Sequence, residues 1–475
     1  MAFQEIKVPD NATIAQKGLA WVDSRFPLTK LFKEHMSEYY APKNFNFWYF
    51  FGALAIVVLA IQIVTGIFLV MNYKPDAAKA FDSVEYIMRE VPWGWLIRYM
   101  HSTGSSMFFV VVYLHMFRGL IYGSYQKPRE LIWIFGCSIF LLLMAEAFFG
   151  YLLPWGQMSY WGAQVIISLF SAIPVVGDEL SLWVRGDYVV SDATLNRFFA
   201  FHVIAVPLVL LILVFLHIVA LHEVGSNNPD GIEIKEKLSW KGTPLDGIPF
   251  HPYYTVKDIV GVGVFMFFFA AVIFYMPELG GYFLEHANFI PADPLKTPEH
   301  IAPVWYFTPF YAILRAVPDK FAGVIAMGGA IVVLFMLPWL DRSKVKSVRY
   351  RGGIFKKALL LFVIAFVGLG YLGTQPATPG ATTVARILTA VYFGFFLLMP
   401  LYTRWEKTKP VPERVTENLT LEERIPMFKA IIDEVILTEE TPGMMGATVV
   451  KRKPNYAGIQ AVLIRFAKNL KKSLD

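Results

Sequence analysis

Four histidines lie inside long apolar segments of the chain, where an ionisable side chain is costly to bury and usually serves a function. His101 and His115 are fourteen residues apart, which on an α-helix is a rise of about 21 Å and a rotation about 40° short of four full turns. These two imidazoles therefore lie on nearly the same helix face, at two depths. The four histidines belong to two segments: His101 and His115 to residues 98–121, and His202 and His217 to residues 198–220.

Pairing by depth sets His101 opposite His202 and His115 opposite His217, because the two segments run in the same direction. Two imidazoles that face each other across a helical bundle can fill both axial positions of a haem iron. Filled axial positions favour electron transfer over oxygen chemistry, so we expect two stacked, non-covalent haems. The alternatives are hydrogen-bonded histidines or a proton relay in a transporter, but four histidines at matched depths favour haem. The single cysteine, Cys137, excludes a CxxCH haem attachment.

Two other apolar segments carry glycines at the same fourteen-residue interval, and a glycine lets a flat macrocycle approach the backbone closely. The alternative is ordinary small-residue packing between membrane helices. Arg98 and Arg118 each lie three residues from a histidine, near a membrane surface. Each could pair with a haem propionate or extend to lipid headgroups. The glycines are Gly52 and Gly66 in residues 47–71, and Gly136 and Gly150 in residues 131–151.

The second histidine segment departs from this interval, since His202 and His217 are fifteen residues apart. One extra residue adds about 100° of rotation and about 1.5 Å of rise, which would swing one ligand away from its partner. Pro207 lies between the two histidines and lacks a backbone N–H. The sequence therefore predicts a kink or a π-bulge that absorbs the extra residue.

The composition indicates an all-α integral membrane protein. Of the 475 residues, 56% are hydrophobic and 17% are charged, and the mean hydropathy is +0.49. A membrane-spanning helix needs roughly 20 apolar residues. We expect eight transmembrane helices, of which the first four form a haem-binding four-helix bundle. The expected spans are residues 47–71, 98–121, 131–151, 198–220, 258–276, 321–340, 355–374 and 384–403.

Lysine and arginine are concentrated in the N-terminal segment and in the loops after the second, fourth and sixth spans. The positive-inside rule places these regions in the cytoplasm, and eight spans then put both termini there. The net charge of +6 is explained by this topology and gives no reason to expect nucleic-acid binding. The N-terminal segment is polar and does not have the pattern of a cleavable signal peptide.

From about Pro42 to Tyr402 the chain carries motifs that resemble cytochrome b of the cytochrome bc1 complex, the quinol:cytochrome c oxidoreductase, in its bacterial single-chain form. The motifs are GYLLPWGQMSYWGA (150–163), FHV (201–203), LHIVALHEVGSNNP (216–229), PYYTVKDIVG (252–261) and TPEHIAPVWYFTPFYAILR (297–315). We accordingly divide the chain into a cytoplasmic N-terminal segment (1–44), a dihaem bundle (45–225), a C-terminal membrane region with the outer-site loop (226–403) and a cytoplasmic tail (404–475).

The resemblance implies a respiratory enzyme that oxidises quinol at an outer site and reduces quinone at an inner site. His101 and His202 would hold a low-potential haem on the outer side, and His115 and His217 a high-potential haem on the cytoplasmic side. The implied partners are the Rieske iron–sulfur protein and cytochrome c1, in a homodimeric complex surrounded by the lipid of the bacterial inner membrane.

The inner quinone site is expected at the cytoplasmic ends of the fourth and fifth spans. Reduction of a quinone takes up two protons, and a histidine and a carboxylate at the membrane surface suit their delivery. In the family, the positions of His222 and Asp258 bracket the quinone. The alternative for Lys257 and Asp258 is a charge pair at a helix N-terminus. The expected site residues are His222, Ser226, Lys257 and Asp258.

The resemblance implies an outer quinol site between residues 157–170, expected as a short amphipathic surface helix, and the loop after the fifth span. The residues expected there are Tyr151, Trp305 and Tyr306. Most family members carry Pro-Glu-Trp-Tyr in this loop, and the glutamate is thought to help a quinol proton outward. This chain reads Pro-Val-Trp-Tyr at residues 303–306 and lacks that carboxylate.

Glu146 is a lone carboxylate within an apolar run, five residues before Tyr151. Such a group is costly to bury unless it is paired, neutral or functional. We hypothesise that Glu146 replaces the missing glutamate as the proton acceptor of the outer site. The alternative is a structural hydrogen bond to a neighbouring span or to a haem propionate.

The tail ends in residues 459–474, where apolar side chains recur at helical spacing among lysines and an arginine. A basic amphipathic helix of this kind could lie on an anionic membrane or dock on a partner. Two other functions compete for the whole chain. A dihaem membrane anchor of a different quinone-linked complex would bind haem without an outer quinol site, and a histidine-bearing transporter would bind no haem.

Overall fold

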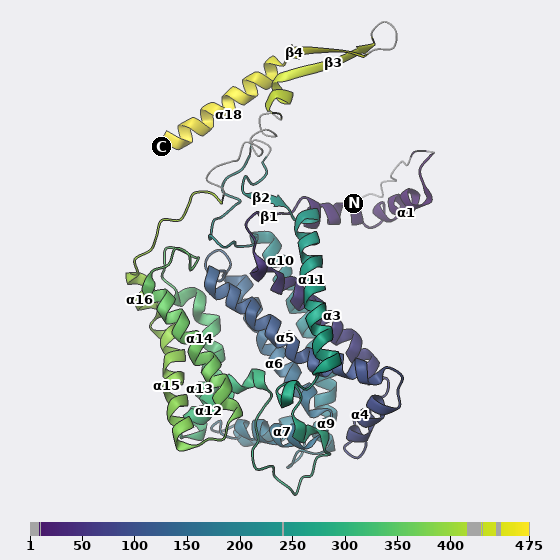
Figure 1. The fold of residues 1–475 in the computed structure, drawn as a ribbon, viewed down its shortest axis with the longest axis vertical. Coiled ribbons are helices and arrows are strands. Elements are labelled where there is room, and N and C mark those ends of the chain that lie inside the picture. Colours follow the sequence, from purple (N-terminus) through teal and green to yellow (C-terminus); the bar gives the residue numbers. More distant parts are fainter. Residues whose placement is uncertain are drawn as a thin grey trace. The chain divides into compact units, whose positions relative to one another are not determined.

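The computed structural model describes residues 9, 11–239, 242–415, 429, 431–442 and 448–474. Within these residues eight helices are long and apolar enough to cross a membrane, which confirms the eight expected spans and a multi-pass membrane protein (Figure 1). The first four spans are formed by α3 (Phe50–Val70), α5 (Gly94–Tyr122), α6 (Glu130–Leu152) and α9 (Asp192–Ala200) continued by η3 (Phe201–Ala205) and α10 (Val206–Val224). The last four are α11 (Phe250–Tyr275), α13 (Lys320–Leu340), α14 (Gly353–Thr374) and α15 (Pro379–Leu397).

Shorter elements connect and flank these spans. Before α3 lie α1 (Ile14–Asp23), α2 (Leu28–Phe32), the π-helix η1 (Lys33–Ser37), β1 (Tyr40–Pro42) and η2 (Phe47–Tyr49). Between spans lie α4 (Ala80–Arg89), α7 (Gln157–Phe170), α8 (Gly177–Arg185), β2 (Gly247–Pro249), η4 (Leu279–Gly281), η5 (His286–Phe289), η6 (Trp305–Phe307) and α12 (Thr308–Ala316). After the last span come α16 (Met399–Trp405), β3 (Ile436–Pro442), β4 (Thr448–Pro454) and α18 (Tyr456–Leu474).

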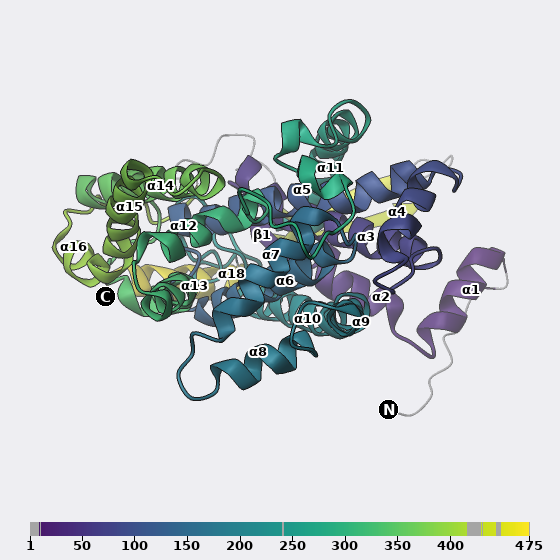
Figure 2. The same cartoon turned by 90° about the horizontal axis from the view of Figure 1, so that it is seen from below.

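The first four spans pack in pairs, α3 on α5 and α6 on α10. Seen from below, α12 to α16 gather on the opposite side of the membrane region from α3, α5 and α10 (Figure 2). There α12 packs against α13, α14 and α15. The expected amphipathic helix over residues 157–170 is confirmed as α7.

The fourth span contains a π-helical turn, η3, between α9 and α10. A π-turn accommodates one residue more than an α-helical turn, so it absorbs an insertion without rotating the rest of the helix. A π-bulge, one of the two predicted ways to absorb the extra residue between His202 and His217, is therefore confirmed. It begins at Phe201, so His202 itself stands on the π-turn.

The described residues form two compact units. One lies within Met1–Gly231 and Pro249–Val411 and contains all eight spans. The other lies within Ile232–Ile248 and Pro412–Asp475 and contains α18, the expected helix near the C-terminus. This second unit also holds an antiparallel pair of strands, β3 and β4, with Ile436 opposite Pro454, which the sequence analysis did not predict. The proposed boundaries at residues 44, 225 and 403 stay predictions.

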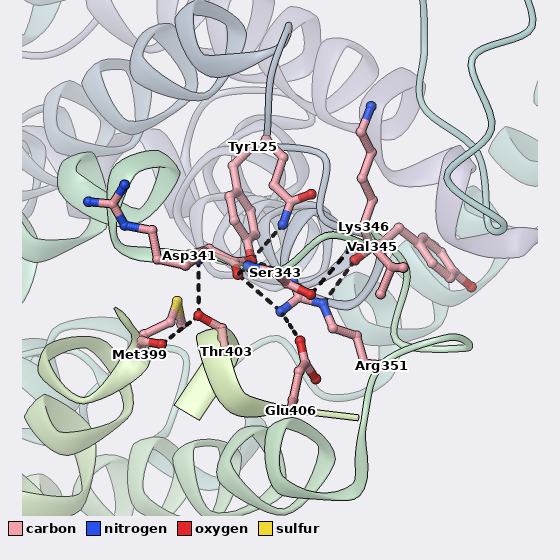
Figure 3. A network of polar contacts seen from close by, with 12 residues as sticks. Tyr125, Asp341, Ser343, Val345, Lys346, Arg351, Met399, Thr403 and Glu406 are labelled. Atoms are coloured by element: carbon pink, nitrogen blue, oxygen red, sulfur yellow. Dashed lines mark hydrogen bonds and ion pairs between the residues drawn. The ribbon is translucent and has the colours of Figure 1, made fainter. Parts of the chain in front are cut away.

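A buried polar network links the ends of α13, α14 and α16 (Figure 3). The Arg351 guanidinium, whose side chain has no exposed surface, donates to both carboxylate oxygens of Asp341 and, at 3.2 Å, to Oε1 of Glu406. The Tyr125 hydroxyl donates to Asp341 Oδ2 at 2.7 Å. Burial opposes ionisation of Asp341, but the charge and hydrogen bonds of Arg351 outweigh it and hold the pKa of Asp341 below its ordinary value.

Candidate functional site

The histidine pair that is expected on the outer side, called the outer pair below, joins α5 to η3. The ring centres of His101 and His202 are 6.0 Å apart. Nδ1 of His101 lies 3.0 Å from the Thr65 hydroxyl. Nδ1 of His202 lies 2.9 Å from the backbone carbonyl oxygen of Glu146 and 3.0 Å from its carboxylate Oε1. With Nδ1 held on both rings, Nε2 remains as the nitrogen that can bind a metal.

The second pair joins α5 to α10 at the other depth. The ring centres of His115 and His217 are 6.4 Å apart. A metal–nitrogen bond of about 2 Å on each side, with about 1 Å from each nitrogen to its ring centre, separates two axial imidazoles by about 6 Å. Both pairs have this separation, so the residues present fit two metal ions with paired imidazole ligands.

Each histidine ring of the two pairs rests on one of the expected glycines. A Cβ atom added to Gly66 would lie 3.2 Å from Cε1 of His101, and one added to Gly52 would lie 3.4 Å from Cε1 of His115. The corresponding distances are 2.4 Å from Gly150 to His202 and 3.5 Å from Gly136 to His217. The glycines thus make room for the rings, and the approach is closest at Gly150.

The two expected arginines lie at opposite ends of α5. Arg98 lines a cavity together with the outer histidine pair. The Arg118 guanidinium carbon lies 4.9 Å from the centre of the Tyr49 ring. Its Nε is buried without a hydrogen-bond partner among the described residues. A buried guanidinium nitrogen in that state fits an anionic group such as a haem propionate.

The cavity beside the outer pair has a volume of about 380 Å³. Its walls include Glu146, Tyr151, Val304 and Tyr306 as well as the two histidines. The space beside the two histidines and the expected outer quinol pocket are therefore one connected cavity. Burial raises the pKa of Tyr306, which keeps its phenol neutral. The Tyr151 hydroxyl is buried and has no hydrogen-bond partner in the described part of the chain.

Trp305 differs from the other expected outer-site residues, because it is not among the described residues that line the cavity. Its Nε1 donates to Ser106 Oγ at 3.1 Å, and its ring stacks on Phe283. Tyr306 instead stacks on Phe109 with ring centres 3.9 Å apart. Trp305 therefore holds η6 against α5, while Tyr306 faces the cavity.

The expected inner-site residues lie where the end of α10 and the start of α11 approach the N-terminal segment. The ring of His222 stacks on Tyr39, with ring centres 4.4 Å apart. Burial raises the pKa of Tyr39, whose hydroxyl has no hydrogen-bond partner among the described residues. Lys257 and Asp258 follow on α11, which packs against η1, and Lys257 Nζ lies 5.1 Å from the centre of the Tyr254 ring.

Three residues of the candidate site were not predicted from the sequence: Thr65, Tyr39 and His35. Nδ1 of His35 lies 3.3 Å from Nδ1 of His222. Thr65 directly precedes Gly66, and that position could have suggested a contact with a histidine. His35 and Tyr39 carry no such signal, because they lie in a polar segment far from His222 in sequence.

Known proteins resemble this chain in sequence and in fold. A family model described as "Cytochrome b/b6/petB" matches residues 36–225, and one described as "Cytochrome b(C-terminal)/b6/petD" matches residues 291–393. Cytochrome b of Allochromatium vinosum is 66% identical over 84% of this chain and 98% of the relative. Cytochrome b/c1 of Bradyrhizobium diazoefficiens is 47% identical over 86% of this chain and 58% of the relative.

A solved structure titled "Hyperthermophilic respiratory Complex III" contains a chain that is 41% identical to this one, with a TM-score of 0.76. The match covers 81% of this chain and 98% of that chain. This chain therefore resembles that chain in fold as well as in sequence. With its two paired-histidine sites and these relatives, the chain belongs to the cytochrome b family.

Proposed function

We propose that this chain is the cytochrome b subunit of a bacterial quinol:cytochrome c oxidoreductase of the bc1 type. It oxidises quinol at an outer site and reduces quinone at an inner site, and so contributes to the proton gradient. The observation that carries the proposal is the pair of histidine sites, each with the separation of two axial imidazoles and each resting on glycines. The likeness to a Complex III chain supports the assignment.

His101 and His202 would hold the low-potential haem b, and His115 and His217 the high-potential haem b. Bound there, the two haems supply one-electron transfer between the outer and inner sides. Thr65 and Glu146 orient the outer imidazoles through Nδ1. The glycines bring the helix backbones close to the macrocycles, and Arg98 and Arg118 would neutralise the propionates.

At the outer site Tyr151 and Tyr306 border the quinol, and Glu146 takes up a quinol proton. The Glu146 carboxylate suits this role because its two oxygens have different surroundings. Oε1 is engaged by His202, whereas Oε2 is buried and has no hydrogen-bond partner among the described residues. Val304, in the position of the missing glutamate, lines the same cavity.

The variant Glu146→Gln tests this role, since glutamine can still accept a hydrogen bond from His202 but cannot take up a proton. We expect slow quinol oxidation with both haems retained, and recovery in the double variant Glu146→Gln/Val304→Glu. If the single variant has intact haem spectra and oxidises quinol at the wild-type rate, Glu146 does not take part in proton transfer.

At the inner site His222 and Asp258 bracket the quinone, with Ser226 and Lys257 beside them. Both protons of quinone reduction enter from the cytoplasmic side, where His222 ends its apolar helix next to Tyr39. The chain lacks a centre that could accept the first electron from quinol. A Rieske iron–sulfur protein and cytochrome c1 supply that path, and the relative named cytochrome b/c1 supports the second of these partners.

The complex is a homodimer in the bacterial inner membrane, with both termini of this chain in the cytoplasm. A dithionite-reduced minus oxidised spectrum of the purified complex tests the central assignment. We expect two b-type haems per chain. His101→Ala and His115→Ala should each remove one haem, and the spectrum of the remaining haem should differ between the two variants. A chain without haem would support the transporter, and haem without quinol oxidation would support a membrane anchor.

A further inference from the structure

Two histidines from distant parts of the chain meet at the expected inner site. Nδ1 of His35, on η1, lies 3.3 Å from Nδ1 of His222, near the end of α10. Their ring centres are 5.2 Å apart, and the rings are inclined by 60°. Tyr39 stacks on the ring of His222 and so fixes the orientation of that ring.

This contact has a chemical consequence, because two ring nitrogens form a hydrogen bond only if one carries a proton and the other a lone pair. When His35 donates from Nδ1, the neutral His222 ring accepts at Nδ1 and carries its own proton on Nε2. A proton passed along the bond therefore reaches one side of His222 while another can leave from Nε2 on the other side. Histidine suits such transfer, because its ordinary pKa lies near physiological pH.

The two rings also differ in their access to water. His35 is exposed and stands on a short surface helix, whereas His222 is partly buried between Tyr39 and the end of α10. The pair therefore leads from bulk water toward the place where the quinone is expected. Tyr39 also contacts His222, and burial raises the pKa of its phenol.

We propose that His35 is the proton-entry residue of the inner quinone site, which relays protons from cytoplasmic water to His222. This inference rests on the proposed function. Each quinone takes up two electrons, which arrive from quinol oxidised at the outer site, and two protons. Each proton forms an O–H bond on a quinone oxygen, and His222 regains its proton from His35, which regains one from water. His222 contacts the substrate, and His35 acts through it.

The test uses the assembled complex with its outer site blocked by an inhibitor. Quinol then reduces the inner haem through the inner site, and by microscopic reversibility the same groups carry the released protons back to cytoplasmic water. Stopped-flow absorbance measures the rate. We expect His35→Ala to slow this reduction roughly tenfold, a modest part of what proton transfer contributes to catalysis. Added imidazole should restore the rate.

Two controls separate a relay from a packing role. His35→Phe keeps a ring beside His222 but cannot carry a proton, so it should be as slow as His35→Ala. His286→Ala removes another exposed histidine, which pairs with Glu278, and should leave the rate unchanged. Wild-type rates in His35→Ala, or full activity in His35→Phe, would overturn the proposal. So would a slow His35→Ala that imidazole does not rescue.

Failure of this inference is distinguishable from failure of the proposed function. If the wild-type complex shows no quinol-driven reduction of the inner haem, the inner site itself is wrongly assigned. If the wild type reacts and the His35 variants react equally fast, with both haems present in their spectra, only the relay is wrong.

Discussion

At the scale of single residues, the four glycines beneath the histidine rings differ in how much space they leave. A Cβ added to Gly150 would approach Cε1 of His202 to 2.4 Å, whereas one added to Gly136 would stay 3.5 Å from His217. A carbon–carbon contact is most favourable at about 3.5–4.0 Å. Substitution by alanine should therefore be blocked at Gly150 and tolerated at Gly136.

We predict that Gly150→Ala loses the outer haem, so that haem per chain falls from two to about one, while Gly136→Ala keeps both. The pyridine haemochrome assay and the low-temperature reduced spectrum measure this. Gly162→Ala is the matched control, because nothing lies within 4 Å of a Cβ added there. Equal haem content in the two test variants would contradict the packing argument.

Sequence reasoning at this scale worked where helix periodicity alone decides position. The fourteen-residue interval predicted one helix face for His101 and His115, and each ring lies opposite its expected histidine partner. The glycines were expected to face haem, whereas each of them lies against a histidine ring. His35 was not predicted, because its contact with His222 joins positions 187 residues apart and no periodic pattern connects them. The place of Trp305 in the outer quinol site stays a prediction, and its indole N–H donates to Ser106 Oγ.

At the scale of elements, the π-turn in the fourth span makes a direct prediction. Deletion of one of its residues, Ile204, would leave an α-helix in which the two histidines are fourteen residues apart. Because a π-turn is one residue longer than the α-turn that it replaces, the register of α9 and α10 is preserved. We predict that the deletion retains both haems.

The matched control deletes Val110 from α5, which has no π-turn to absorb the loss. One missing residue there rotates His115 by about 100° relative to His101, so one haem should be lost. Haem content per chain, measured in both deletion variants, tests whether the π-turn absorbs the lost residue. Loss of haem in the Ile204 deletion alone would show that the π-turn itself is needed.

The buried network of Arg351 ties three helices together and predicts a pH-dependent stability. Arg351→Met would leave Asp341 and Glu406 buried without their cation, at a cost of about 3–5 kcal/mol in the free energy of unfolding. Arg349→Met is the control. Its side chain is half exposed, so loss of its pair with Asp230 should cost at most about 1 kcal/mol. Unfolding in mixed detergent micelles measures both.

The sign of the pH effect follows from Asp341, whose pKa is lower in the folded state than in the unfolded chain. Its contribution to stability is present above the ordinary aspartate pKa of about 3.9 and is lost as the pH falls through the folded-state pKa. The wild type should therefore lose this stability only below about pH 4. In Arg351→Met this loss should be absent, since the carboxylate no longer has its cation.

At the scale of the whole molecule, the membrane dictates most of what could be predicted. Backbone groups in lipid must be satisfied within a helix, so an apolar run of about 20 residues has one fold available to it. This is why all eight spans were found from the sequence. Outside the membrane the constraint disappears, and the β3–β4 hairpin and the short helices α4 and α8 were missed. Their sequences are too short and mixed to show a decisive period.

The orientation of the chain in the membrane can be tested by labelling introduced cysteines. Cys137 is the only cysteine and is 2% exposed, so the wild-type chain should not react with a membrane-impermeant maleimide. Leu295, in the loop after α11, is 97% exposed, and Lys344, in the loop after α13, is also exposed. These two loops follow an odd and an even span, so they lie on opposite sides of the membrane.

We predict that Leu295→Cys is labelled in right-side-out vesicles and Lys344→Cys only in inverted ones, because the basic loops remain in the cytoplasm. Lys453→Cys, in the second compact unit, should behave as Lys344→Cys does, since eight crossings return the chain to the side on which it began. Labelling of Lys344→Cys from outside would reverse the topology and with it the assignment of outer and inner sites. Agreement of Leu295→Cys with Lys453→Cys would instead mean that one of α13, α14 and α15 does not cross the membrane.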